Sequence, residues 1–135
     1  MITAVDSNVL IDVFADDVRY AARSLQALRA CQAAGSLVVC EIVAAEVGRY
    51  FDSLDDLQRV FAALRIRVEP LGMEACFLAG QAFRAYRSRG GMRDRVLADF
   101  LIGAHARLHA ARLVTRDRGF YRIHFTELNV LDPMA

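Results

Sequence analysis

The sequence contains no lysine, because all 17 of its basic residues are arginine in a chain of 135 residues. The missing amine excludes a Walker-A phosphate lysine, Schiff-base chemistry and lysine-assisted aspartyl phosphorylation. The arginines are nearly balanced by 16 acidic residues, for a formal net charge of +1. This balance argues against a protein that coats DNA by general electrostatic attraction, and leaves room for a local basic patch.

Cysteine is scarce, and long apolar runs and targeting signals are missing. Cys31, Cys40 and Cys76 form no C-x-x-C pair and stand among apolar residues, which predicts three buried, reduced thiols and a cytoplasmic protein. The N-terminus lacks the basic segment of a signal peptide, and no apolar run is long enough to cross a membrane. The length, without repeats or linkers, predicts one domain over residues 1–135, and 56% hydrophobic residues supply its core.

Short β-rich runs alternate with longer stretches of helical periodicity. We expect strands at residues 2–5, 37–40, 66–68, 113–115 and 130–131. We expect helices at residues 9–14, 18–34, 41–50, 54–64, 74–87 and 95–110. This alternation predicts an α/β fold, a three-layer α/β/α sandwich with a mostly parallel central sheet. In such folds the functional site lies beyond the carboxyl ends of the strands.

Most of the acidic residues stand in polar surroundings and are expected on solvated faces or at helix starts. Asp12 belongs to this group, since its spacing puts it on the polar side of its helix. Four others stand where a carboxylate is unexpected, and these are Asp6, Glu46, Asp99 and Asp117.

The sequence neighbours of these acids allow a structural interpretation as well as a functional one. Asp6 ends the first strand, where it is also placed to cap the following helix. Glu46 and Asp99 lie inside apolar stretches, where an unpaired carboxylate costs several kcal/mol. Internal salt bridges to Arg49 and Arg95 would satisfy them without any catalytic role.

Asp117 follows the strand at 113–115, and its alternative role is a turn residue with ion pairs to Arg116 and Arg118. Because all four acids fall at or near the carboxyl edge of the sheet, we expect them to converge. Carboxylates in one pocket repel one another, and a hard divalent cation, Mg²⁺ or Mn²⁺, relieves that repulsion. Such a site activates water and neutralises phosphate charge, which favours phosphodiester hydrolysis.

Four segments carry a family resemblance that extends over essentially the whole chain. They read VDSN at 5–8, VAAEV at 43–47, ADFLIGAHA at 98–106 and LVTRDRGFY at 113–121. In order and spacing they resemble PIN-domain ribonucleases, specifically the VapC-type toxins of bacterial toxin–antitoxin systems. One departure is Glu41, where a small polar residue or proline is expected.

The resemblance implies an acidic site that binds Mg²⁺ or Mn²⁺, with Asp6 and Asp99 the firmest ligands beside Glu46 and Asp117. Asn8 and Thr115 would support this site, directly or through water. The implied activity is endonucleolytic cleavage of RNA by an activated water. The implied partners are a second copy in a homodimer and a VapB-type antitoxin, which has a DNA-binding end and an extended segment that fills the toxin's groove.

Other features leave alternatives open. A group of arginines precedes the Asp99 helix and is expected to contact RNA phosphates, or else to form a solvated helix end; its members are Arg87, Arg89, Arg93 and Arg95. His105 and His109 have zincin spacing, but Ala106 replaces the required glutamate, so a structural role is expected. Two other functions remain open: a PIN-type nuclease of RNA processing or of DNA without a toxin role, and a catalytically weak binding module.

Overall fold

Five short strands form one parallel sheet in a computed structural model that describes residues 1–91 and 96–135. The strand order is β3-β2-β1-β4-β5, and every neighbouring pair is parallel. The strands are β1 (Ile2–Val5), β2 (Ser36–Val39), β3 (Ile66–Val68), β4 (Arg112–Val114) and β5 (Val130–Leu131). The predicted parallel sheet is confirmed, and β1 occupies its centre.

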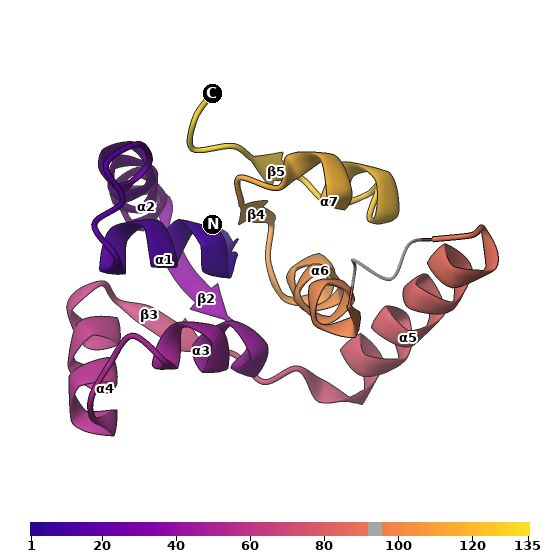
Figure 1. The fold of residues 1–135 in the computed structure, drawn as a ribbon, viewed down its shortest axis with the longest axis horizontal. Coiled ribbons are helices and arrows are strands. Elements are labelled where there is room, and N and C mark those ends of the chain that lie inside the picture. The colour runs from indigo at the N-terminus through magenta and orange to yellow at the C-terminus, as the bar shows by residue number, and fades with distance from the viewer. Residues whose placement is uncertain (92–95) are drawn as a thin grey trace.

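The helices pack around this sheet as the alternating pattern predicts. They are α1 (Ser7–Phe14), α2 (Ala21–Ala34), α3 (Glu41–Gly48), α4 (Leu54–Ala63), α5 (Gly72–Ser88), α6 (Leu97–His109) and α7 (Arg118–His124). Figure 1 shows α5 beside α6, on the opposite side of the molecule from α4. None of the helices in the described residues is long and apolar enough to cross a membrane.

The helix bounds differ from the expected ones by a few residues, and three of the differences have a clear cause. The α1 helix begins at Ser7, because the Asp6 carboxylate caps it by accepting a hydrogen bond from the Ser7 N–H. The α2 helix begins only at Ala21, since Asp17 Oδ1 accepts hydrogen bonds from two successive N–H groups and forms a separate turn before it. The α7 helix was not expected, and it directly follows Asp117.

The buried core gathers the apolar strands and the inner faces of the helices. Cys31 and Cys40 are buried free thiols as expected, whereas Cys76 is exposed on α5, so that prediction was wrong. His105 is buried, and its Nε2–H donates to the carbonyl oxygen of Glu69 at 2.8 Å. Burial lowers the pKa of His105, so a neutral imidazole fills this place and the predicted structural role agrees with its contacts.

The α6 helix approaches the chain after α7 closely at Gly103. A Cβ atom at this position would overlap the ring of Phe125, which is itself buried. Gly80 on α5 provides a contrast, since a Cβ atom there would have no heavy atom of the described residues within 4 Å, apart from those of its own stretch of helix. Close approach therefore requires glycine at one of these two helical sites and not at the other.

We predict that Gly103→Ala lowers the free energy of unfolding by about 1–3 kcal/mol, because the methyl group overpacks the ring of Phe125. Gly80→Ala, the matched control, should raise it by about 0.5–1 kcal/mol through backbone entropy alone. Urea denaturation of both variants measures the two effects. Equal changes in the two variants would contradict the packing described for α6.

Candidate functional site

Asp6 is a buried carboxylate at the carboxyl end of the central strand, with 6% of its surface exposed. Its Oδ1 accepts a hydrogen bond from the Ser7 N–H at 2.7 Å. Its Oδ2 accepts hydrogen bonds from the Thr115 hydroxyl at 2.7 Å and from Asn8 Nδ2 at 3.3 Å. Burial nevertheless raises the pKa of Asp6 to about 6, because these hydrogen bonds only partly offset desolvation.

Thr115 joins the first and fourth motif segments. Its hydroxyl donates to Asp6 and accepts hydrogen bonds from Asn8 Nδ2 at 3.3 Å and from the Asp117 N–H at 2.9 Å. A hydroxyl has one donor and two acceptor positions, so this group is fully used. The contacts of Asn8 and Thr115 are those of residues that hold Asp6 in one orientation.

Asp99 and Asp117 lie close enough to this centre to act on its charges. Asp99 stands in the first turn of α6, and its negative charge adds to the rise in the pKa of Asp6. Tyr121 lies near the same three carboxylates. Burial and the charges of Asp6, Asp99 and Asp117 raise its pKa well above the ordinary value. The phenol therefore stays protonated, and it donates a hydrogen bond to Asp6.

Tyr121 is a part of the site that the sequence did not predict. It follows Asp117 by four residues, which is one turn of α7. Because no helix was expected there, the spacing carried no signal.

Glu46 differs from the expectation of an apolar environment. It lies on an exposed position of α3, although its sequence neighbours are apolar. Its Oε1 accepts a hydrogen bond from the Ser7 hydroxyl at 2.5 Å, and the Ser7 N–H contacts Asp6. Glu46 is therefore linked to Asp6 through Ser7, at the solvent-exposed side of the network. The alternative of an internal pair with Arg49 is wrong.

Asp12 also departs from its prediction, since only 3% of its surface is exposed. Both of its carboxylate oxygens accept hydrogen bonds from the Arg116 guanidinium, at 2.8 and 2.9 Å. Arg118 pairs with Asp132 at 3.5 Å. The expectation of a solvated Asp12 was wrong, and these two arginines pair with acids other than Asp117.

The predicted arginine group is only partly described. Arg87 and Arg89 are exposed at the end of α5, whereas Arg93 and Arg95 lie outside the described residues. Glu41, the departure from the family pattern, accepts a hydrogen bond from the Leu71 N–H at 3.0 Å. It thus supports the connection between β3 and α5 and is engaged outside the acidic centre.

The donor chemistry of the centre suits a hard cation, since its ligands are oxygen atoms only. Among the described residues, no three acidic, histidine or cysteine side chains form a compact metal-ligating group. Mg²⁺ keeps several waters and is commonly held by one or two carboxylates, so a centre built on Asp6 and Asp99 fits this mode of binding. A cation would also offset the desolvation that raises the pKa of Asp6.

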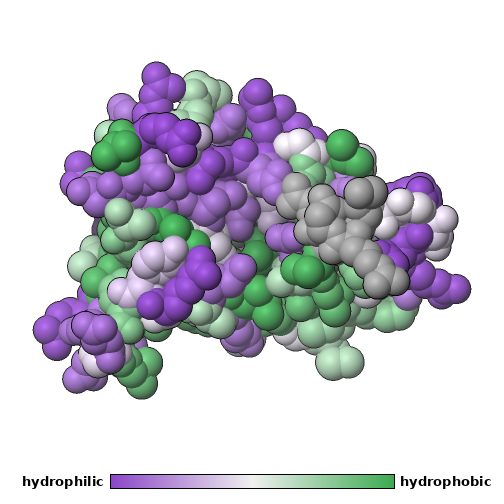
Figure 2. All heavy atoms as spheres, viewed as in Figure 1, coloured by the Kyte–Doolittle hydropathy of each residue, from purple (hydrophilic) through white to green (hydrophobic). Residues whose placement is uncertain are grey.

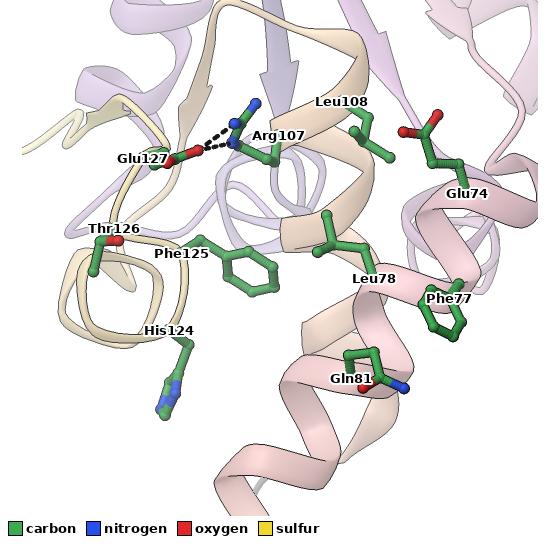
Figure 3. Close-up of a pocket in the computed structure, with 10 residues that line it drawn as sticks. All are labelled: Glu74, Phe77, Leu78, Gln81, Arg107, Leu108, His124, Phe125, Thr126 and Glu127. Atoms are coloured by element: carbon green, nitrogen blue, oxygen red, sulfur yellow. Dashed lines mark hydrogen bonds and ion pairs between the residues drawn. The ribbon is translucent and has the colours of Figure 1, made fainter.

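A cavity of about 460 Å³ lies away from these acids, between α5, α6 and the chain after α7. Figure 3 shows Phe77 and Leu78 of α5 on one side and Phe125 on the other, with Arg107 and Glu127 joined above them. Its described lining includes Glu74 and Glu127, but none of the four predicted carboxylates. It is therefore an apolar hollow separate from the acidic centre.

The sequence as a whole matches one known family of proteins. The PIN domain family model matches residues 3–126, which spans all four acidic positions. The chain belongs to the PIN domain family. No curated protein matches the sequence at a significant level.

Solved structures share the PIN domain's fold over its full length. VapBC2 from Rickettsia felis, bound to a DNA fragment from its promoter, matches with a TM-score of 0.75 and 19% identity, covering 98% of each chain. VapBC-1 from nontypeable Haemophilus influenzae matches with a TM-score of 0.72 and 20% identity, covering all of both chains. A toxin–antitoxin complex from Klebsiella pneumoniae matches with a TM-score of 0.65 and 22% identity, covering 97% of each. These likenesses confirm the predicted three-layer fold.

The raised pKa of Asp6 predicts how the stability of the metal-free PIN domain depends on pH. The folded-state value of about 6 exceeds the ordinary 3.8, so the folded protein binds this proton more tightly than the unfolded chain. This stabilisation is full below the ordinary value and is lost as the pH rises through about 6. The loss amounts to about 3 kcal/mol at most, from about 1.4 kcal/mol per pKa unit.

Asp6→Asn should lack this loss, because the amide carries no charge at any pH. As the pH rises from about 4 to about 8, the unfolding free energy of the variant should therefore increase relative to that of the wild type. Urea denaturation with EDTA measures the difference, with Asp55→Asn on the exposed first turn of α4 as control. Parallel pH profiles of wild type and Asp6→Asn would contradict the desolvation of Asp6.

Proposed function

We propose that the PIN domain is a metal-dependent endoribonuclease and the toxin of a cytoplasmic toxin–antitoxin pair. PIN-domain nucleases hydrolyse nucleic acids, and membership of the family supports that class of activity here. The observation that carries the proposal is the desolvated Asp6 carboxylate, held beside the charge of Asp99 at the carboxyl edge of a parallel sheet. An anion kept in such a place is stabilised by a cation.

Asp6 and Asp99 would hold Mg²⁺ or Mn²⁺, with Asp117 and Glu46 completing the acidic surroundings. When bound, the cation lowers the pKa of water and neutralises charge on a phosphate. Thr115 keeps both Asp6 and the Asp117 backbone in place through its fully used hydroxyl.

Each remaining polar group has a separate task in this proposal. Asn8 fixes the second oxygen of Asp6 and also accepts a hydrogen bond from the Arg116 N–H at 3.2 Å. Tyr121, which is itself buried, donates to Asp6. Glu46, at the solvent side, offers a carboxylate that can take a proton from an approaching water.

Substrate contact is assigned to the arginines at the end of α5. Arg87 and Arg89 are exposed, and neither forms an ion pair with a carboxylate of the described residues. Guanidinium groups bind phosphate oxygens in bidentate fashion. We extend the assignment to Arg93 and Arg95 on sequence grounds. Contacts of this kind position a polynucleotide backbone without reading its sequence.

A VapB-type antitoxin is the proposed regulatory partner. The full-length likeness to solved toxin–antitoxin complexes supports this partner. An apolar cavity of about 430 Å³ next to α4 offers a receptive surface, with Leu57 and Phe61 in its wall and the exposed Leu54 at its side. Figure 2 shows hydrophobic side chains gathered along the lower half of one face, over α3 and the nearest part of α5 and α6. We also propose a homodimer, as the family resemblance implies.

Cleavage assays test the nuclease directly. We predict that the purified protein cuts members of a panel of structured and unstructured RNAs with Mg²⁺ or Mn²⁺ and does not cut with EDTA. Asp6→Asn and Asp99→Asn should each lower the cleavage rate by at least about 100-fold, because each removes a charge that holds the cation. Asp99→Asn should fold normally in metal-free buffer, since it relieves charge crowding around Asp6.

Asp55→Asn is the matched control and should retain full activity. Cleavage that survives both active-site substitutions would contradict the proposed site. RNA binding without metal and without cleavage by the wild type would instead identify a binding module. A DNA panel run alongside distinguishes the RNA substrate from a DNA substrate.

The arginine assignment makes a separate prediction about salt. Arg87→Gln and Arg89→Gln, made in the Asp99→Asn background, should each reduce the slope of log affinity against log salt by about 1, because each removes one phosphate contact. RNA binding with EDTA at several salt concentrations measures the slope. Arg59→Gln, on the exposed surface of α4, should leave the slope unchanged.

A further inference from the structure

An ion pair between the buried Asp12 and the half-buried Arg116 lies next to the acidic centre, and the proposed function gives it no role. Asp12 is 3% exposed, and the two Arg116–Asp12 hydrogen bonds are parallel and bidentate at 2.8 and 2.9 Å. Ser24 of α2 donates to the same carboxylate at 2.8 Å. The Arg116 guanidinium also lies over the ring of Tyr20, 4.0 Å from its centroid.

This pair joins elements that already meet at the site. Asp12 follows Asn8 by four residues on α1, so both project from one face of that helix. Arg116 stands between Thr115 and Asp117 in the segment after β4, and its N–H donates to Asn8 Oδ1. The segment after β4 is therefore held against α1 at the Asp6 end by Thr115, in the middle by Asn8, and at the far end by Asp12.

Stability alone is a weak reason for such a pair. Replacing an ion pair that is out of water by apolar side chains of similar volume is often neutral or stabilising, because the cost of desolvating the charges disappears. In this pair that cost falls mainly on Asp12, since 28% of the Arg116 side chain is exposed. What an apolar contact lacks is the fixed direction of a bidentate guanidinium–carboxylate pair. The pair consequently fixes the orientation of residues 115–117, which include the Thr115 hydroxyl that contacts Asp6 and the Asp117 carboxylate.

We propose that Asp12 and Arg116 are positioning residues of the acidic centre, which fix Thr115 and Asp117 relative to Asp6. The proposal rests on the proposed function, since it assigns these two residues to the same hydrolytic site. Neither side chain is assigned a contact with RNA or with the cation. Their effect passes through the backbone of residues 115–117.

The decisive variant replaces the whole polar cluster without leaving an unpaired charge. It combines Asp12→Leu, Ser24→Ala and Arg116→Met, so that no buried partner of the pair remains unsatisfied. We expect it to fold with an unfolding midpoint close to that of the wild type. We expect its kcat for RNA to fall about 10- to 100-fold with little change in KM, as is typical when an outer support of a metal site is lost.

Two readouts do not depend on catalysis. The affinity of the protein for Mn²⁺ alone, measured by titration calorimetry, should fall about 10-fold in the triple variant. Hydrogen exchange of the metal-free protein should quicken at the Arg116 and Asp117 amides, whose acceptors are Asn8 and Thr115 side chains. Arg116→Lys should retain part of kcat, because lysine keeps the charge but loses the bidentate geometry.

The matched control removes another arginine–carboxylate pair, Arg107 with Glu127, by Arg107→Met and Glu127→Gln. This pair lies at the far end of α6 from Asp99 and should leave all readouts unchanged. A folded triple variant with wild-type kcat, Mn²⁺ affinity and exchange would overturn the positioning role while leaving the proposed nuclease intact. A wild type that neither cuts RNA nor binds Mn²⁺ would overturn both. If the triple variant fails to fold, unchanged kcat and exchange in Arg116→Lys would overturn the role in its place.

Discussion

The structure depends on keeping one carboxylate, that of Asp6, out of water at the end of the central strand. Desolvation of this group is costly, and its pKa of about 6 measures how incompletely the surrounding donors offset that cost. Ser7, Asn8, Thr115 and Tyr121 are all arranged as donors toward it. Without a bound cation, a protein with such a desolvated carboxylate is less stable than one with a neutral side chain in the same place. A divalent cation would supply the missing stabilisation.

The parallel sheet makes this arrangement possible. Because β1 lies between β2 and β4, the segment after β4 reaches Asp6 from one side. On the other side, α3 brings Glu46 to the Ser7 hydroxyl. Residues separated by about a hundred positions in the chain, such as Asp6 and Thr115, thus become direct hydrogen-bond partners. The strands themselves are short and apolar, so the polar groups that follow them are what distinguish one edge of the sheet from the other.

Much of the fold and of the centre was predictable from the sequence, and the exceptions have physical reasons. Asp6 and Thr115 follow apolar strands, and parallel strands must bring such positions to one edge. The burial of Asp12 was not predictable, because its partner Arg116 is distant in the chain and local periodicity does not indicate such a contact. Glu46 and Cys76 are exposed despite apolar neighbours, since each lies on the outward face of its helix. Tyr121 was missed with α7, a helix of only 7 residues.

The most direct measurement of the central claim is the carboxyl carbon chemical shift of Asp6, followed by NMR through a pH titration of the metal-free protein and repeated with Mg²⁺. We expect titration near pH 6 without metal, as desolvation requires, and a marked fall in that pKa when Mg²⁺ is present. Titration near the ordinary value of 3.8, with no response to Mg²⁺, would contradict the claim that Asp6 is a desolvated carboxylate that binds a cation.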